Sequence, residues 1–104
     1  MKSYLANRNW IKAHALCAGQ FRGLALVAIK NAVEQEPDEK LVPKYLELQA
    51  QIESSVRKKT QAFKSFKRAK DIIEKNPNYF LIGENCKLKD RISEALLEFE
   101  VEPT

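Results

Sequence analysis

The sequence contains few of the residues that build loops, disulfide frameworks or catalytic sites. Among its 104 residues are three glycines, four prolines, two cysteines and one histidine. So few glycines and prolines leave room only for short connections between regular elements. Two cysteines fit neither a disulfide framework nor a zinc site, and they favour a reducing, cytoplasmic location. One histidine, with no nucleophile elbow around any serine, gives no basis for nucleophilic catalysis.

Long hydrophobic runs and strand patterns are also missing. No apolar run approaches the roughly 20 residues that a membrane-spanning helix needs. No uninterrupted apolar region follows Lys2, so no secretory signal is expected. The sequence has no glycine-rich phosphate loop and no sustained alternation of β-branched residues. We therefore expect no sheet, no membrane segment, no cofactor, no metal and no enzyme activity.

Apolar residues recur at helical spacing through the first third of the chain. Steps of three and four residues place them on one face of a helix. They are Trp10, Ala13, His14, Cys17, Phe21, Leu24 and Ala28. Asn7 or Asn9 is a candidate N-cap, and a break near Gly19 predicts two helices. Residues 24–29 are apolar on every face, so we expect them to be surrounded and to form the centre of the domain.

Prolines and short polar residues mark the later helix boundaries. Pro37 ends the first unit, and Asp38 can cap the element after it. Between Pro43 and Pro77 there is no glycine or proline. The apolar spacing in that stretch predicts one long helix, or two helices divided near Lys59.

A last helix is expected after the Asn-Pro-Asn stop, with Asn78 or Asn85 as its cap. Its apolar face consists of Leu88, Ile92, Ala95, Leu96 and Phe99. The tail at residues 101–104 is expected to fray. The predicted fold class is all-α: a compact helical bundle or a short helical-hairpin array of three to five helices. One helical domain would span residues 1–104.

Charge alternates along the chain in blocks. Residues 1–33 hold five basic residues and no acidic ones, whereas residues 34–53 and 71–104 are net acidic. Residues 54–70 hold seven basic residues and no acidic ones. The seven are Arg57, Lys58, Lys59, Lys64, Lys67, Arg68 and Lys70. Such a cluster attracts phosphates or acidic surfaces, although a solvated helix face that pairs with the acidic blocks would have the same composition.

A short pattern occurs twice. Residues 29–34 precede Pro37, and residues 69–74 precede Pro77, with an offset of 40 residues between the prolines. The second copy resembles the end of the second helix of a tetratricopeptide repeat. The offset differs from the 34 residues of that family, and Glu53 stands where the family packs a small residue. The resemblance implies a scaffold that binds a partner peptide in a groove.

Two smaller groupings of reactive side chains have simpler explanations than catalysis. His14 and Cys17 stand three apart, but zinc needs three or four protein ligands, so we interpret them as a half-buried pair. Four carboxylates lie close together in sequence: Glu34, Glu36, Asp38 and Glu39. We interpret these as a helix cap and solvent-facing charge rather than as an acid–base pair. Trp10 is expected to anchor the core.

The residue inventory favours a non-enzymatic interaction protein, either an adaptor or a regulator. It would capture an acidic partner, an acidic protein surface or a nucleic acid, through the seven basic residues. A primary role in binding nucleic acid is the first alternative. A helix-turn-helix reader does not fit, because residues 24–33 are too apolar to lie in a groove. A structural homo-oligomer, associating through the heptad-like face over residues 45–73, is the second alternative.

Overall fold

A computed structural model describes the backbone of residues 2–101 and the side chains of residues 3–99. Within residues 2–101 there are five α-helices and no strand. The helices are α1 (Lys2–Ala18), α2 (Arg22–Gln35), α3 (Val42–Ser55), α4 (Lys59–Lys75) and α5 (Gly83–Val101). Two short 3-10 helices precede α3 and α5: η1 (Glu39–Leu41) and η2 (Pro77–Phe80). The predicted all-α fold class is therefore confirmed.

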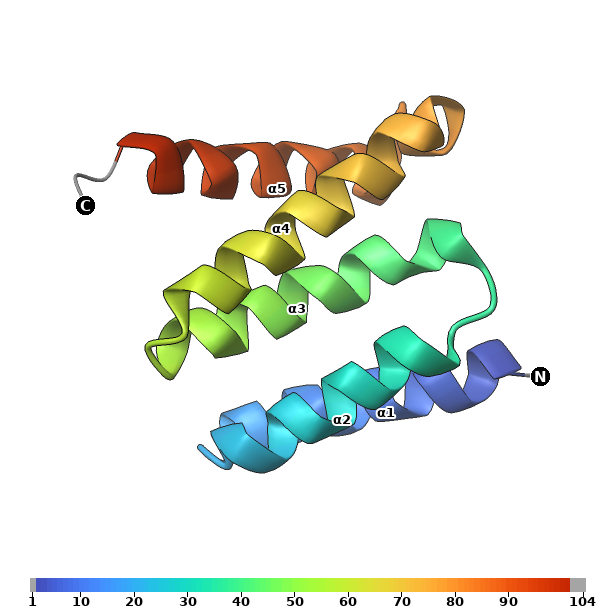
Figure 1. Cartoon of the computed structure of the whole chain (residues 1–104). Helices are drawn as coiled ribbons and strands as arrows, with labels where there is room; N and C mark the ends of the chain where they lie inside the picture. Colours follow the sequence, from blue (N-terminus) through green and yellow to red (C-terminus); the bar gives the residue numbers. More distant parts are fainter. Residues whose placement is uncertain (1, 102–104) are drawn as a thin grey trace.

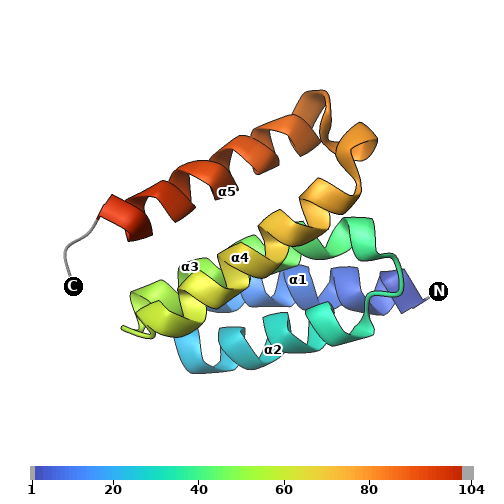
Figure 2. The same cartoon turned by 45° about the horizontal axis from the view of Figure 1, so that its top comes forward.

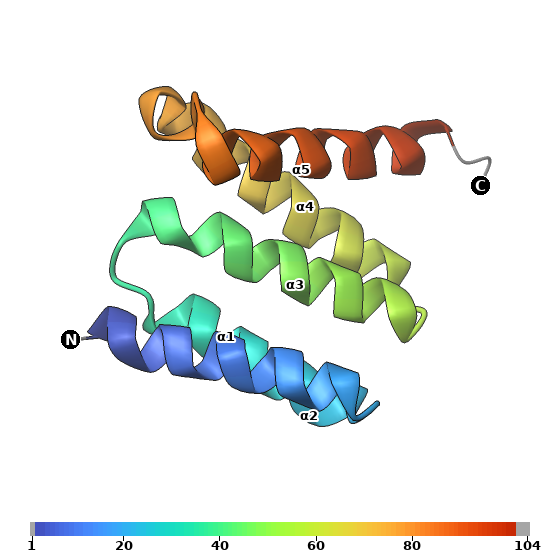
Figure 3. The same cartoon turned by 180° about the vertical axis from the view of Figure 1, so that it is seen from behind.

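The helices are stacked in three layers (Figure 1). α1 packs against α2 as an antiparallel pair, and α3 packs against α4 in the same way. α2 contacts α3, and α4 contacts α5, so each layer meets the next through neighbouring elements in the chain. The views in Figures 2 and 3 agree that the α1/α2 pair and α5 lie at opposite ends of the stack. No helix in the described part of the chain is both long and apolar enough to cross a membrane.

Both tight turns within the helix pairs use the same backbone motif. Gln20 has a φ of 66°, and the following amide of Phe21 donates to the carbonyl of Leu16 at 2.8 Å. Arg57 has a φ of 64°, and the amide of Lys58 donates to the carbonyl of Glu53 at 2.7 Å. This is the Schellman arrangement, which satisfies carbonyls at a helix end and normally places glycine at the left-handed position. Both helices therefore end with a non-glycine residue, Gln20 or Arg57, in the left-handed conformation.

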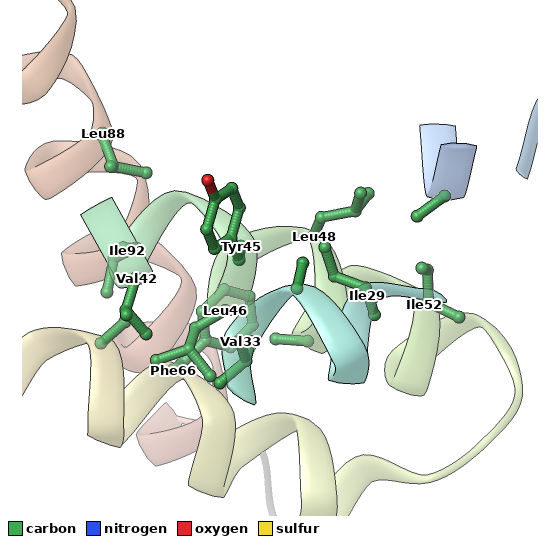
Figure 4. Packing of buried hydrophobic residues seen from close by; sticks show 14 of the residues in the cluster. Ile29, Val33, Val42, Tyr45, Leu46, Leu48, Ile52, Phe66, Leu88 and Ile92 are labelled. Carbon is green, nitrogen blue, oxygen red and sulfur yellow. The ribbon is translucent and has the colours of Figure 1, made fainter. Parts of the chain in front are cut away.

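The core lies between the layers and is centred on α3. Tyr45 and Leu46 of α3 are almost completely buried, as are Ile29 of α2 and Ile92 of α5. Figure 4 shows side chains of α2, α3 and α5 in one cluster, with Leu88 and Ile92 of α5 at the opposite side from Ile29 of α2. Phe66 of α4 closes the same cluster. α3 therefore contributes buried side chains to the packing between the layers.

The expectation that residues 24–29 form the centre of the domain is wrong. Ala25 and Ile29 are buried, but Leu24 and Val27 are 60% and 58% exposed. α2 lies in an end layer and packs against α1 and α3, so the side of α2 that faces away from both helices stays exposed. An apolar composition on every face does not by itself determine how many neighbours a helix has.

Several predicted boundaries are confirmed and others are corrected. The break near Gly19 occurs. Of the two alternatives for the next stretch, two helices are found, and they divide at residues 56–58, just before the predicted position near Lys59 and Thr60. Asp38 caps the following turn, because its carboxylate accepts a bond from the amide of Lys40 at 3.1 Å. Asn7 and Asn9 lie inside α1 rather than at its start, since the helix begins earlier than expected.

The last helix begins at Gly83, which has a φ of 69°. Neither predicted cap starts it, because Asn78 lies in η2 and Asn85 lies inside α5. The predicted fraying concerns residues 101–104, of which 102–104 lie outside the described residues.

Two carboxylates are buried, which the sequence did not indicate. Glu36 was expected to face solvent, but it accepts hydrogen bonds from the Ser3 hydroxyl, from the Tyr45 hydroxyl at 2.9 Å and from the Asp38 amide at 3.1 Å. These bonds tie α1 and α3 to the segment between α2 and η1. Glu53 is only 2% exposed and accepts a bond from the Ser65 hydroxyl at 2.7 Å. Buried carboxylates need such partners because loss of hydration is costly.

Candidate partner-binding surface

α4 separates its buried and basic residues onto different sides of one helix. Its buried residues are Ala62, Ser65, Phe66, Ala69, Ile72 and Ile73. Lys64, Lys67 and Arg68 occupy positions between these and are all exposed. Steps of three and four residues bring the three side chains onto a common face. We call these three residues the α4 ridge.

The ridge has no carboxylate partners within the described residues. Among residues 3–99, salt bridges join Lys87 to Glu84 and Arg91 to Glu47, and neither involves a ridge residue. From Lys64 to Arg68 the helix rises about 6 Å, so three positive charges occupy little more than one turn. Three unpaired cations at this spacing create a positive local potential that an acidic ligand can neutralise.

The other four predicted binding residues divide into two places. Arg57 and Lys58 are exposed in the turn between α3 and α4, and Lys59 is the first residue of α4. Lys70 lies three residues after Lys67, at the edge of the ridge, but it is partly buried, unlike the three ridge residues. The seven residues are therefore not one patch: the structure brings three onto the ridge and three into the turn at its amino end.

Lys75 extends the line of the ridge and was not among the predicted residues. It is exposed and lies seven residues after Arg68, two helical turns along the same face. That spacing is visible in the sequence, but Lys75 lies outside the acid-free basic segment, which ends before Asp71. Asp71 lies between Arg68 and Lys75 on this face and is also exposed.

Acidic residues border one end of the ridge. A groove of about 500 Å³ is lined by Arg68, Asp71 and Lys75 on α4 and by Glu34 and Glu39 across from them. None of these opposite charges approaches within salt-bridge distance in the described residues. An acidic segment therefore lies beside the basic one, as expected for a solvated face that pairs with the acidic blocks, yet the ridge residues stay unpaired.

A second groove lies between α1, α3 and α5. It has a volume of about 380 Å³, and its walls include Trp10 and Lys44. The Lys44 ammonium lies 4.7 Å from the centre of the Trp10 ring, and the His14 ring meets the same indole edge-on at 4.7 Å. Trp10 is only partly buried and packs against the core, in agreement with its expected anchoring role.

Arg91 closes the other side of this groove. Its guanidinium donates to both carboxylate oxygens of Glu47, at 2.7 and 3.1 Å. The hydrogen bond to Glu47 is the main cause that raises the pKa of Arg91. Glu47 neutralises Arg91, and the walls also contain one further cation and one further acid, Lys44 and Glu84, so the groove carries no charge excess that selects one class of ligand.

The histidine and cysteines do not lie in a cluster of metal-ligating side chains in the described part of the chain. Among the described residues, no group of three or more His, Cys, Asp or Glu side chains could hold a metal ion. Burial raises the pKa of the Cys17 thiol, and Arg22 opposes this shift weakly. Cys17 is partly buried, whereas His14 is exposed and contacts Trp10, so the expected half-buried pair is correct for Cys17 and wrong for His14.

Comparison with known proteins gives no relative from which a function could be transferred. No protein-family model matches the chain, and neither a curated protein nor a solved structure matches it. The resemblance to tetratricopeptide repeats stays a prediction. Function must accordingly be argued from the α4 ridge and its surroundings.

Proposed function

We propose that this protein is a non-enzymatic interaction protein that captures an acidic protein surface through the α4 ridge. The observation that carries the proposal is the exposure of Lys64, Lys67 and Arg68 without carboxylate partners among residues 3–99. Unpaired surface cations gain more from a new acidic partner than cations already held in salt bridges. The rigid helix beneath them fixes their relative positions before binding.

The acids around the ridge favour a protein partner over a nucleic acid. Duplex DNA carries one negative charge about every 1.7 Å along its axis. A protein surface that follows the phosphate backbone therefore needs a long, unbroken row of basic residues. Here Asp71 interrupts the line before Lys75, and Glu34 and Glu39 border the adjoining groove. A short acidic segment can place its carboxylates on the ridge and avoid those acids, whereas a continuous phosphate backbone meets them.

Binding would proceed in two steps. The field of the α4 ridge and of the turn residues Arg57 and Lys58 first attracts the partner, which raises the association rate at low salt. Apolar contact then slows dissociation. Another groove of about 500 Å³ includes Lys59, the first residue of α4, and its aromatic lining of Phe66 and Phe99 offers that apolar surface. Glu98 also lines this groove, so the apolar part of the partner would have to bind there rather than its carboxylates.

Fluorescence anisotropy with defined probes tests the proposal. The probes are a labelled ten-residue Asp/Glu peptide, and single-stranded and duplex DNA and RNA, each measured at two salt concentrations. We expect the acidic peptide to bind at low salt and to be released as screening increases. Oligonucleotides that bind more tightly than the peptide would favour the nucleic-acid alternative. Absence of binding to every probe at low salt would refute electrostatic capture.

The homo-oligomer alternative, as predicted over residues 45–73, lacks a free surface. The apolar residues of that face are buried inside the chain, including Tyr45, Ile52, Phe66 and Ile73. A partner helix could reach them only if α3 and α4 separated. Self-association, if it occurs, must use another part of the molecule.

A further inference from the structure

The two ends of the helical stack carry opposite charges. At the α1/α2 end, Arg8 and Lys12 are exposed one helical turn apart on α1. At the α5 end, Asp90, Glu94 and Glu98 are exposed at four-residue intervals. The exposed cations of α5, Lys87 and Arg91, are paired with Glu84 and Glu47, which leaves the three acids in excess. Figures 1 and 3 show these helices in the first and last layers, separated by the α3/α4 layer. Neither set forms a salt bridge within residues 3–99.

Both ends also carry large apolar side chains that no other helix covers. Leu24 and Val27 are exposed on α2, and Leu5 of α1 is 48% exposed. On α5, Leu97 is 57% exposed and lies between Glu94 and Glu98 in sequence. Single exposed apolar residues are common on protein surfaces. Here they border charged residues, so a partner of the other sign could cover them in the same contact.

The spacing of the charges at the two ends is the same. Four residues along an α-helix correspond to a rise of about 6 Å, both from Arg8 to Lys12 and from Asp90 to Glu94. Two helices placed side by side could therefore pair both cations with both carboxylates at once. The apolar residues next to the charges would be covered in the same contact.

We propose that the α5 face of one copy docks on the α1/α2 face of a second copy, head to tail. A two-fold symmetric contact would bring each face against itself and place like charges together, which is unfavourable. The head-to-tail contact instead pairs basic with acidic residues, and it continues the layer order already present within one chain. This contact is independent of the α4 ridge, which lies in the middle layer.

Sedimentation velocity of the full chain measures the association directly. At about 1 mM protein and low ionic strength, the weight-average mass should rise above the 12.0 kDa of one chain and fall again when salt is added. An Arg8→Glu/Lys12→Glu variant and an Asp90→Lys/Glu94→Lys variant should each stay at 12.0 kDa when measured alone. An equimolar mixture of the two should associate, because the acidic α5 face of one meets the basic α1/α2 face of the other.

Two further variants separate this contact from general charge effects and from the proposed function. Leu97→Ser keeps every charge and should weaken association by about tenfold, through the loss of apolar burial. Lys64→Glu should leave association unchanged while it weakens binding of the acidic peptide. A wild-type mass that stays at 12.0 kDa under these conditions overturns the proposal. So does association of either charge-reversed variant alone as strong as that of the wild type.

Discussion

Replacement of Tyr45 by phenylalanine removes one oxygen from the centre of the stack and leaves the ring in place. The lost hydroxyl is 2.9 Å from Glu36 Oε1, and Tyr45 is 1% exposed. A hydrogen bond to a charged group contributes about 1.5–3 kcal/mol. Because Glu36 keeps its bonds from Ser3 and from the Asp38 amide, we expect a loss of about 2 kcal/mol.

Urea and thermal unfolding of Tyr45→Phe measure this loss. A loss of about 2 kcal/mol in a chain of this size lowers the melting temperature by roughly 9 °C. The urea midpoint should fall without a change in slope, since the surface exposed on unfolding stays the same. A double-mutant cycle with Glu36→Gln isolates the pair. A loss below about 0.5 kcal/mol would show that the Tyr45–Glu36 bond does not stabilise the layers.

The same variant predicts a difference in alkaline stability. Burial is the main cause that raises the pKa of Tyr45 above its ordinary value of 10.0, and the hydrogen bond to Glu36 raises it further. The unfolded chain therefore loses the phenolic proton at a lower pH than the folded chain does. The contribution of Tyr45 to the free energy of unfolding is therefore complete below pH 10. It declines above pH 10 by up to about 1.4 kcal/mol per pH unit. Tyr45→Phe should lack this part of the decline, so the stability difference between the two proteins should narrow above pH 10.

Three other substitutions or modifications test separate parts of the fold. Gln20→Gly should raise the free energy of unfolding by about 0.5–1 kcal/mol in urea, because it relieves a left-handed non-glycine residue; a destabilised variant would contradict this. Ser65→Ala should lower that free energy by about 1–3 kcal/mol, because Glu53 would keep only the Gln49 amide, 3.3 Å away; an unchanged urea midpoint would argue against it. Cys17 should react with iodoacetamide more slowly at pH 8 in the folded protein than in urea, because burial raises its pKa; equal rates would show that the thiol is accessible.

The sequence predicts where helices lie along the chain better than it predicts which helices pack against one another. The end of α4 follows from the Asn-Pro-Asn stop, although the sequence left open whether one helix or two precede it. The exposure of the ridge follows from local spacing, since three- and four-residue steps define faces without knowledge of the rest of the chain. The exposure of Leu24 and Val27 does not follow, because a helix apolar on all faces gives no indication of which face meets another layer. That information lies in the stacking order.

Local sequence patterns also do not predict contacts between residues that are far apart in the chain. Glu36 is buried because Ser3 and Tyr45 come from two other helices to donate to it, and no sequence spacing links the three. The groove beside Trp10 exists only because α1, α3 and α5 present side chains to one another. Lys75, in contrast, was predictable, since its two-turn spacing from Arg68 does not depend on tertiary structure.

The dependence of acidic-peptide binding on the position of charge, rather than on its total, tests the proposed function most directly. Reversal of Lys64, Lys67 and Arg68 to glutamate is compared with reversal of three exposed cations on other helices, Arg8, Arg22 and Lys30. Both variants have the same net charge, and circular dichroism checks that both fold. We expect the ridge variant to lose binding of the labelled Asp/Glu peptide by about 100-fold at low salt, and the matched variant by less than about tenfold. Equal losses in the two variants would show that overall charge, and not the α4 ridge, attracts the partner.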